Sequence, residues 1–331
     1  MRRDYSDSFL KDMAPPLADH YASLLDVCRE AVREAADRME SLVTAAADVS
    51  VPPGASATGW ELFPRPDHPA HLWTKPLRDY TNRSGKLLRP YLVCLCLEAY
   101  GKDPAEYRSL IGAAEVIHSS SLILDDVSDD SPLRRGAKTA HQQYGMRVAG
   151  AAASATLNLA SELVWAERHR LELGRTERLL AELAWEHFVT GVGTAVDVVW
   201  AEGNDVQRTE ERYLQQIVHR STSYTYRLPL KVGAVCSGAP SADFDGLSEF
   251  GELVGLAFQL IDDILNVKPT DSHWGKVVAE DVTQGKRSLQ VIVALERSDP
   301  AGRRRLAQIL DSRTRDPVSY THLTLPTILR V

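Results

Sequence analysis

The sequence is short of cysteine and of long apolar runs, and each shortage excludes a class of protein. Four cysteines among 331 residues, none in a Cys-x-x-Cys pair, argue against a disulfide framework. Cys94 and Cys96 lie in an apolar run, where we expect reduced, buried thiols. No uninterrupted apolar stretch reaches about 18 residues, so no transmembrane helix and no stable membrane insertion are expected. The opening MRRDYSDSFLKDM lacks the apolar core of a secretory signal, which favours a cytoplasmic location.

A surplus of basic charge is also missing. The formal net charge is −7, which excludes the basic footprint of a nonspecific nucleic-acid-binding protein. Anionic substrates remain compatible with this charge, because local cations and metal ions can override it. With 44% hydrophobic and 25% charged residues, the chain has the composition of a globular protein with a sizeable core.

The periodicity of the sequence predicts an all-α fold. Residues 18–47 carry apolar side chains three and four positions apart, as in an amphipathic helix, and residues 48–72 are rich in proline and glycine. We therefore interpret residues 1–71 as an N-terminal helix and linker. Residues 72–315 follow as one large helical bundle, with short breaks that include one near Gly174–Thr176.

The C-terminal segment does not fit this pattern. Residues 316–331, DPVSYTHLTLPTILRV, are rich in threonine and proline and lack a helical period. PVSYTHL resembles a translated sequencing adapter, so we expect a non-native tail after a truncated C-terminus.

Two acidic pairs interrupt apolar helical segments. In IHSSSLILDDVSDDSPLRRG (117–136), Asp125 and Asp129 are one helical turn apart and follow an apolar run, with Asp126 between them. Their repulsion needs an offsetting partner, and a divalent cation would supply it. In GLAFQLIDDILNV (255–267), Asp262 and Asp263 form the second pair. Oxygen ligands without a His or Cys cluster favour Mg²⁺.

Basic residues accompany both pairs in short motifs. Any one of them is most simply interpreted as a solvated surface charge, but together they suit a diphosphate, which Arg binds through two parallel hydrogen bonds and Lys binds as a point charge. They are Lys86 and Arg89 in GKLLRP (85–90), Arg134 and Arg135, Arg220, and Lys276 and Lys286 in GKVVAEDVTQGK (275–286).

These motifs, in this order, together with TAVDVVW (194–200) and HRSTSYTYRLPLKVGA (219–234), resemble the trans-isoprenyl diphosphate synthases over roughly residues 72–300. The resemblance implies the isoprenoid synthase fold, with helices around a central cavity, and a homodimer. It also implies Mg²⁺-dependent condensation of isopentenyl diphosphate with an allylic diphosphate, by ionisation, condensation and elimination. No nucleic acid is expected as a partner.

The resemblance also assigns roles to residues. For isopentenyl diphosphate it implies Lys86, Arg89, His118 and Arg135. For three Mg²⁺ ions it implies Asp125, Asp126, Asp129 and Asp262, with Asp263 and Asn266 flanking that site. For the allylic diphosphate it implies Arg134, Arg220 with Ser221, Lys276 and Lys286, with Gln259 assisting.

The sequence departs from the family pattern at three places. Asn266 stands where many members have aspartate, Arg220–Ser221 replaces a Lys-Thr pair, and Gly193–Thr194 replaces Gly-Gln before Asp197. GVGTAV (191–196) faintly resembles a dinucleotide-binding loop, but close helix packing explains it better because no strand precedes it.

Product length depends on cavity depth in this family. Ser120 and Ser121 lie one turn before Asp125, where members that stop at C15 often carry an aromatic residue, and Ile117 could form the next barrier. Two serines favour geranylgeranyl diphosphate, C20. The alternatives are a farnesyl diphosphate synthase, a class I terpene cyclase and a non-catalytic subunit of a heteromeric synthase. GKLLRP and Arg134–Arg135–Gly136 favour a synthase over a cyclase.

Overall fold

The protein is described by a computed structural model over residues 15–45, 74–83, 85–203, 208–267 and 280–312. Within these residues the chain is helical apart from one short hairpin, which confirms the predicted all-α fold. None of the described helices is long and apolar enough to cross a membrane. The described residues form two compact units, one from Met1–Glu182 and Pro229–Ser241, the other from Leu183–Leu228 and Ala242–Val331.

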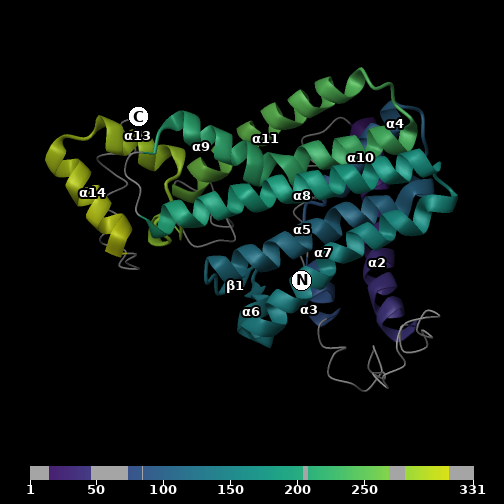
Figure 1. The fold of residues 1–331 in the computed structure, drawn as a ribbon, viewed down its shortest axis with the longest axis horizontal. Coiled ribbons are helices and arrows are strands. Elements are labelled where there is room, and N and C mark those ends of the chain that lie inside the picture. The colour runs from purple at the N-terminus through teal and green to yellow at the C-terminus, as the bar shows by residue number, and fades with distance from the viewer. Residues whose placement is uncertain (1–14, 46–73, 84, 204–207, 268–279, 313–331) are drawn as a thin grey trace, which may run out of the picture. The chain divides into compact units, whose positions relative to one another are not determined.

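The first unit is built around two adjacent long helices, α5 and α7 (Figure 1). α5 (Arg108–Ser128) is buried along most of its length and packs against α2 as well as α7. A helix that is apolar on most sides is stable only when surrounded, so α5 forms the core of the unit. Its end carries Asp125 and Asp126. The unit comprises α2 (Pro15–Ala45), α3 (Thr74–Asn82), α4 (Leu88–Ala99), η3 (Pro104–Tyr107), α5, β1 (Leu133–Arg134), β2 (Ala137–Lys138), α6 (Ala140–Tyr144), α7 (Met146–Ala166), η4 (Glu167–His169), the start of α8 (Leu173–Glu202) and nearly all of α10 (Leu228–Ser237).

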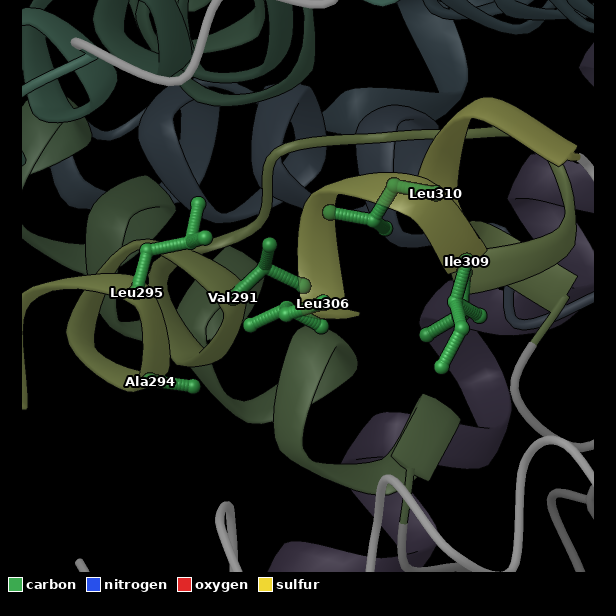
Figure 2. Packing of buried hydrophobic residues seen from close by; sticks show 7 residues of the cluster. Val291, Ala294, Leu295, Leu306, Ile309 and Leu310 are labelled. Atoms are coloured by element: carbon green, nitrogen blue, oxygen red, sulfur yellow. The ribbon is translucent and has the colours of Figure 1, made fainter. Parts of the chain in front are cut away.

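The second unit places α11 (Asp243–Val267) against η5 (Val218–Arg227), a π-helical segment. α13 (Leu289–Arg297) and α14 (Pro300–Ser312) pack together through Val291, Leu295, Leu306 and Leu310, which are all nearly inaccessible to solvent (Figure 2). The remaining elements are the end of α8, α9 (Glu210–Ile217) and α12 (Glu280–Thr283).

Helix boundaries agree with the sequence in some places and differ in others. The helix predicted over 18–47 runs over Pro15–Ala45. The break predicted near Gly174–Thr176 lies just before these residues, because the interruption falls around η4 and α8 begins at Leu173. Gly174 falls in the first turn of α8, where amides have no partner within the helix and glycine costs little.

All four cysteines are buried and free, as expected for Cys94 and Cys96. Cys28 of α2 and Cys94 of α4 lie with their sulfur atoms 3.7 Å apart. The hydrogen-bond contact with Cys94, together with burial, raises the pKa of the Cys28 thiol, so Cys28 acts as a packing group. Residues 46–73 and 313–331 lie outside the described residues, so the predictions of a linker and a non-native tail remain predictions.

Candidate active site

Asp126 is the buried member of the first aspartate motif. Its side chain is fully inaccessible, and Tyr80 of α3 donates a hydrogen bond to Oδ2 at 2.6 Å. Arg134 donates to Oδ1 through Nε at 2.9 Å and through Nη2 at 2.5 Å. Both carboxylate oxygens therefore accept strong hydrogen bonds, and Asp126 holds Arg134 in place.

Asp125 and Asp129 are each about half-buried at the end of α5. Within the described ranges, no three acidic, His or Cys side chains converge closely enough to hold a metal ion by themselves. Asp125 and Asp129 offer carboxylate oxygens, which are the donors that Mg²⁺ takes from proteins while it keeps water and binds substrate phosphate.

Arg134 and Arg135 lie on a short hairpin that follows the motif. β1 and β2 pair antiparallel, with Arg134 opposite Ala137, and Arg135 and Gly136 form the two-residue loop. Both loop residues have positive φ, 51° and 75°, as a type I′ turn requires. Glycine adopts this conformation readily, whereas arginine does not. The hairpin therefore carries one arginine at the end of β1 and the next in its turn.

The described non-glycine residues with positive φ are Leu87, Asp130 and Arg135. All three lie in or beside the motifs that the sequence singled out, GKLLRP and the aspartate motif with its Arg pair. Such strained backbone persists only where surrounding contacts enforce it, and it tends to cluster at functional sites.

His118 lies among the cations of the first unit. It is buried on α5, and burial together with Arg89 and Arg135 holds the pKa of its imidazole well below the usual value. A neutral His118 accepts as well as donates hydrogen bonds, so it can contact an anion beside the arginines without adding charge. Burial raises the pKa of the neighbouring Glu115 on the same helix, while Arg89 and Arg135 oppose that shift.

The GKLLRP segment meets the hairpin at Gly85. A Cβ atom added at Gly85 would lie within 2.9 Å of the guanidinium of Arg135, so this glycine lets the two segments approach. Lys86 is exposed and Arg89 half-buried. The structure therefore brings Arg135 close to one of the predicted phosphate-binding segments.

Ser120 and Ser121 differ in environment. Ser120 is fully buried and donates a hydrogen bond to the carbonyl oxygen of Ala153 in α7 at 2.7 Å. Ser121 is half-buried and donates to the carbonyl oxygen of Ile117, itself buried, at 3.1 Å. Ser120 is therefore bonded to the backbone of α7, whereas Ser121 bonds within its own helix and is the more accessible of the two.

In the second unit, Asp263 repeats the arrangement of Asp126. It is buried, accepts a short hydrogen bond from the phenol of Tyr213, and accepts one from Gln259 at 2.9 Å. Burial raises the pKa of Asp263 to about 6, although these two hydrogen bonds oppose the shift. Asp262 is more exposed, as Asp125 is in the first motif. In each pair, then, the second aspartate is held by a tyrosine and the first has the greater access to solvent.

Arg220 is held by Asp197, whose role the sequence left open. Nη1 of Arg220 donates to Asp197 at 2.5 Å, and Arg208 lies 3.8 Å from the same carboxylate. Gly193 makes this packing possible, because an added Cβ would lie 2.5 Å from the backbone nitrogen of Arg220. Close helix packing therefore accounts for Gly193, the second glycine of GVGTAV.

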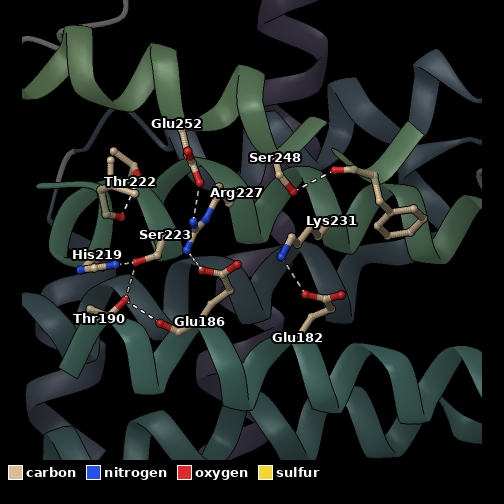
Figure 3. Close-up of polar contacts among 12 residues, drawn as sticks. Glu182, Glu186, Thr190, His219, Thr222, Ser223, Arg227, Lys231, Ser248 and Glu252 are labelled. Atoms are coloured by element: carbon tan, nitrogen blue, oxygen red, sulfur yellow. Dashed lines mark hydrogen bonds and ion pairs between the residues drawn. The ribbon is translucent and has the colours of Figure 1, made fainter. Parts of the chain in front are cut away.

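A second ion-pair network stabilises the frame of this unit (Figure 3). Arg227 at the end of η5 donates to Glu186 of α8 at 2.7 Å and to Glu252 of α11 at 2.6 Å. Glu186 is fully buried, so the arginine compensates a charge that would otherwise be costly. These two contacts join η5, the segment that carries Arg220 and Ser221, to α8 and α11.

The remaining predicted residues are placed as follows. Lys286 lies 3.9 Å from Asp281, and the side chain of Asn266 accepts a hydrogen bond from the backbone amide of Asp281 at 3.4 Å. Asn266 is therefore a structural link between α11 and α12. Lys276 lies outside the described residues.

Sequence reasoning missed Tyr80, Tyr213 and Arg83, which support the site from outside the motifs. Tyr80 and Tyr213 are separated from Asp126 and Asp263 by 46 and 50 residues, so no local pattern connects them. The sequence did offer a clue to Arg83, because this residue stands three positions before Lys86 and next to GKLLRP, the segment predicted to bind phosphate.

Comparisons with known proteins identify the family and the fold. The sequence model of the polyprenyl synthetase family matches residues 70–323, which extends into the segment from 316 onward. A short chain isoprenyl diphosphate synthase of Methanothermobacter thermautotrophicus is 35% identical over 69% of this chain and 68% of its own length. A geranylgeranyl diphosphate synthase of Methanosarcina mazei is 31% identical over 72% and 71%. The fold resembles a polyprenyl synthase from Caulobacter crescentus complexed with calcium and isoprenyl diphosphate, with a TM-score of 0.71, 23% identity and coverage of 92% and 84%.

Proposed function

This chain belongs to the polyprenyl synthetase family, and from that premise we propose that it joins isopentenyl diphosphate to an allylic diphosphate to give geranylgeranyl diphosphate. The family match confirms the predicted reaction class: the chain is an isoprenyl diphosphate synthase, a prenyltransferase. It also favours this class over the class I terpene cyclases. The product length, the number of metal ions and the role of each residue belong to the proposal.

One observation carries the assignment of roles, namely the different environments of the aspartates within each pair. Asp126 and Asp263 are buried and hydrogen-bonded to tyrosines, whereas Asp125, Asp129 and Asp262 are more exposed. We assign the more exposed set to Mg²⁺ and the buried aspartates to positioning. When bound, Mg²⁺ would neutralise charge on the leaving diphosphate. The resemblance gives three ions.

The arginines bind and orient the substrates in this proposal. Arg134, fixed by Asp126, and Arg220, fixed by Asp197, contact the allylic diphosphate, with Lys286 and Lys276 as further cations. Arg135, Arg89, Lys86 and neutral His118 hold isopentenyl diphosphate. Donors already fixed before the reaction stabilise developing negative charge without reorganising, which is the largest contribution to many enzymatic rates.

The proposed C20 product rests on small residues near the aspartates and on the name of one relative. Ser121 offers little bulk on α5 one turn before Asp125, so a growing chain would not be stopped at that level. The relative from Methanosarcina mazei is named for a geranylgeranyl product. Ile117, which is buried one turn before Ser121 on α5, is the next candidate barrier to the growing chain.

An apolar stripe on α8 supports the predicted homodimer. Trp185, Phe188, Val192 and Val199 are each between 43% and 66% exposed, at spacings of three, four and seven residues along one face. Exposed apolar patches of this kind mark protein–protein contacts. Sedimentation of the wild type beside Phe188→Glu tests this: a dimer that dissociates in the variant supports the stripe as the interface.

The direct test is product analysis with Mg²⁺, isopentenyl diphosphate and, separately, dimethylallyl, geranyl and farnesyl diphosphates. We expect a C20 diphosphate that EDTA abolishes. A C15 product would indicate a farnesyl diphosphate synthase, and a cyclised hydrocarbon would contradict the reaction class. Absence of turnover would point to a non-catalytic subunit and would contradict the proposal.

Two variants test the division of roles. Asp125→Asn should lower kcat by about a hundredfold or more, because several kcal/mol of charge stabilisation is lost, while Tm stays near that of the wild type. Asp126→Asn should lower Tm as well, since it disturbs the buried contacts to Tyr80 and Arg134. Equal effects on Tm would contradict the assignment.

A further inference from the structure

Arg83 is a nearly buried arginine just beyond the end of α3. Its side chain is 7% exposed, which is unusual for arginine and calls for compensation by specific partners. Nη2 donates to Asp79 at 2.6 Å, and the guanidinium stacks over the ring of Tyr80, 4.4 Å from its centroid. These contacts fix the orientation of the guanidinium plane.

The same guanidinium joins the two strands of the hairpin that carries Arg134 and Arg135. Nη1 donates to the carbonyl oxygen of Arg134 in β1 at 3.1 Å, and Nη2 donates to the carbonyl oxygen of Lys138 in β2 at 2.7 Å. In return, Nη1 of Arg135 donates to the carbonyl oxygen of Arg83 at 3.4 Å. Arg83 thus acts as a cross-link from outside the hairpin.

The hairpin needs such support for two reasons. Each strand has only two residues, and an isolated two-stranded hairpin is marginally stable in water. Its turn also places Arg135 in the left-handed region, which arginine disfavours. An external group that binds both strands holds the turn in this conformation.

The loss of Arg83 would affect the two hairpin arginines unequally. The guanidinium of Arg134 is also anchored by Asp126 through two hydrogen bonds. The contact described for the guanidinium of Arg135 is to the backbone carbonyl oxygen of Arg83, beside Gly85, and substitution of the Arg83 side chain keeps that oxygen. Arg135 therefore depends on Arg83 through the hairpin, because the Arg83 side chain holds the two strands that fix the turn, whereas Arg134 has its own anchor in Asp126.

We propose that Arg83 is a positioning residue that holds Arg135 in place to bind the diphosphate of isopentenyl diphosphate. This rests on the proposed function, which assigns Arg135 to that substrate. Arg83 itself touches no substrate in this proposal. Lysine cannot replace it, because an ammonium lacks the planar fork that binds two carbonyls and a carboxylate at once.

The test compares Arg83→Lys and Arg83→Ala with Arg78→Ala. Arg78 lies on the same helix and pairs with Asp37 at 3.0 Å and with Glu40, both on α2, so it controls for the loss of an α3 ion pair. KM for each substrate, kcat and Tm are measured for the full chain. Arg83→Lys should raise KM for isopentenyl diphosphate about tenfold, leave KM for the allylic substrate within about twofold and keep Tm near the wild-type value.

A purely structural role predicts a different result. Both Arg83 variants would then lower Tm without a selective change in KM for isopentenyl diphosphate, and Arg83→Lys would restore much of the loss. That pattern, or an equal rise of both KM values, would overturn the proposal. Arg78→Ala should leave both KM values unchanged.

Direct binding separates this inference from the proposed function. Calorimetric titration of isopentenyl diphosphate gives Kd for each variant without turnover. If the wild type binds but does not react, the proposed function fails while Kd still tests Arg83. A Kd that is unchanged in Arg83→Lys, or no binding by the wild type, would overturn the inference.

Discussion

Tyr80 donates a 2.6 Å hydrogen bond to Asp126, and the same phenol oxygen accepts one at 3.1 Å from the backbone amide of Ala140. This tyrosine therefore connects the second aspartate of the first motif to the start of α6. Tyr80 is 1% exposed, so neither contact can be replaced by bulk water.

Tyr80→Phe should destabilise the protein by about 1–3 kcal/mol, because it leaves a buried carboxylate short of one donor. Arg134, which shares that carboxylate, should lose orientation, so kcat should fall as well. Urea denaturation and steady-state turnover check both effects.

Tyr144→Phe is the matched control. Tyr144 packs against the same cluster as Tyr80, but its hydroxyl accepts a hydrogen bond from Gln143 at an exposed position. We expect a change within about 0.5 kcal/mol. A loss as large as that of Tyr80→Phe would mean that packing, and not the bond to Asp126, accounts for the effect.

Ser121→Phe should shorten the product from C20 to C15, because an aromatic ring would then block the level one turn before Asp125. Ser120→Phe should instead lower stability by about 1–3 kcal/mol, since Ser120 is fully buried against the backbone of α7. Product analysis and thermal melts of both variants distinguish the two positions. If Ser121→Phe still made C20, the assignment of Ser121 to the floor would be wrong.

Gly193→Ala should destabilise the second unit and raise KM for the allylic substrate. Its new methyl group would meet the backbone of Arg220 at 2.5 Å, and backbone cannot move aside as a flexible side chain can. We expect a loss of about 1–3 kcal/mol from overpacking, measured by thermal unfolding and kinetics.

Gly191→Ala tests whether steric contact or helix propensity determines the stability change at Gly193. Gly191 lies in the same helix, and nothing lies within 4 Å of an added Cβ. Alanine there should stabilise the protein by about 0.5–1 kcal/mol, because glycine is the poorer helix former. Losses of similar size in both variants would refute the close-packing explanation.

His187 should make the folded state sensitive to acid. Burial lowers the pKa of its imidazole to about 4, although Glu186 opposes the shift. The unfolded chain takes up this proton near pH 6.5, whereas the folded protein does so only near pH 4. Stability should therefore decrease as pH falls from about 6.5 to about 4.

His187→Gln should flatten that part of the stability curve. Unfolding free energies measured by urea denaturation at intervals from pH 7 to pH 4 test this. An unchanged slope in His187→Gln would show that other groups cause the acid dependence.

The sequence was sufficient for the fold class and for the motifs because both depend on local spacing. Apolar periodicity identified α2, and the spacing of Asp125 and Asp129 by one helical turn follows from helix geometry. It could not show which aspartate of a pair is buried, since that is decided by Tyr80 and Tyr213, which come from distant segments.

Two local predictions show the same limit. Gly174 marks the position of the break only to within a few residues, because it lies in the first turn of α8 and the interruption lies just before that helix. Ser120 and Ser121 are adjacent and chemically identical, yet the contact of Ser120 with α7 gives them different environments. Only tertiary packing distinguishes such positions.

Because η5 has π-helical hydrogen bonding, the number of residues in this segment should be fixed. A π-helical turn holds more residues than an α-helical turn, so deletion of one residue between Val218 and Arg227 would favour ordinary α-helical bonding and would change which residues of the segment face each neighbouring helix. Arg220 and Arg227 would then no longer face Asp197 and Glu186 together. Homologues that carry both ion pairs should therefore align through this segment without insertions or deletions.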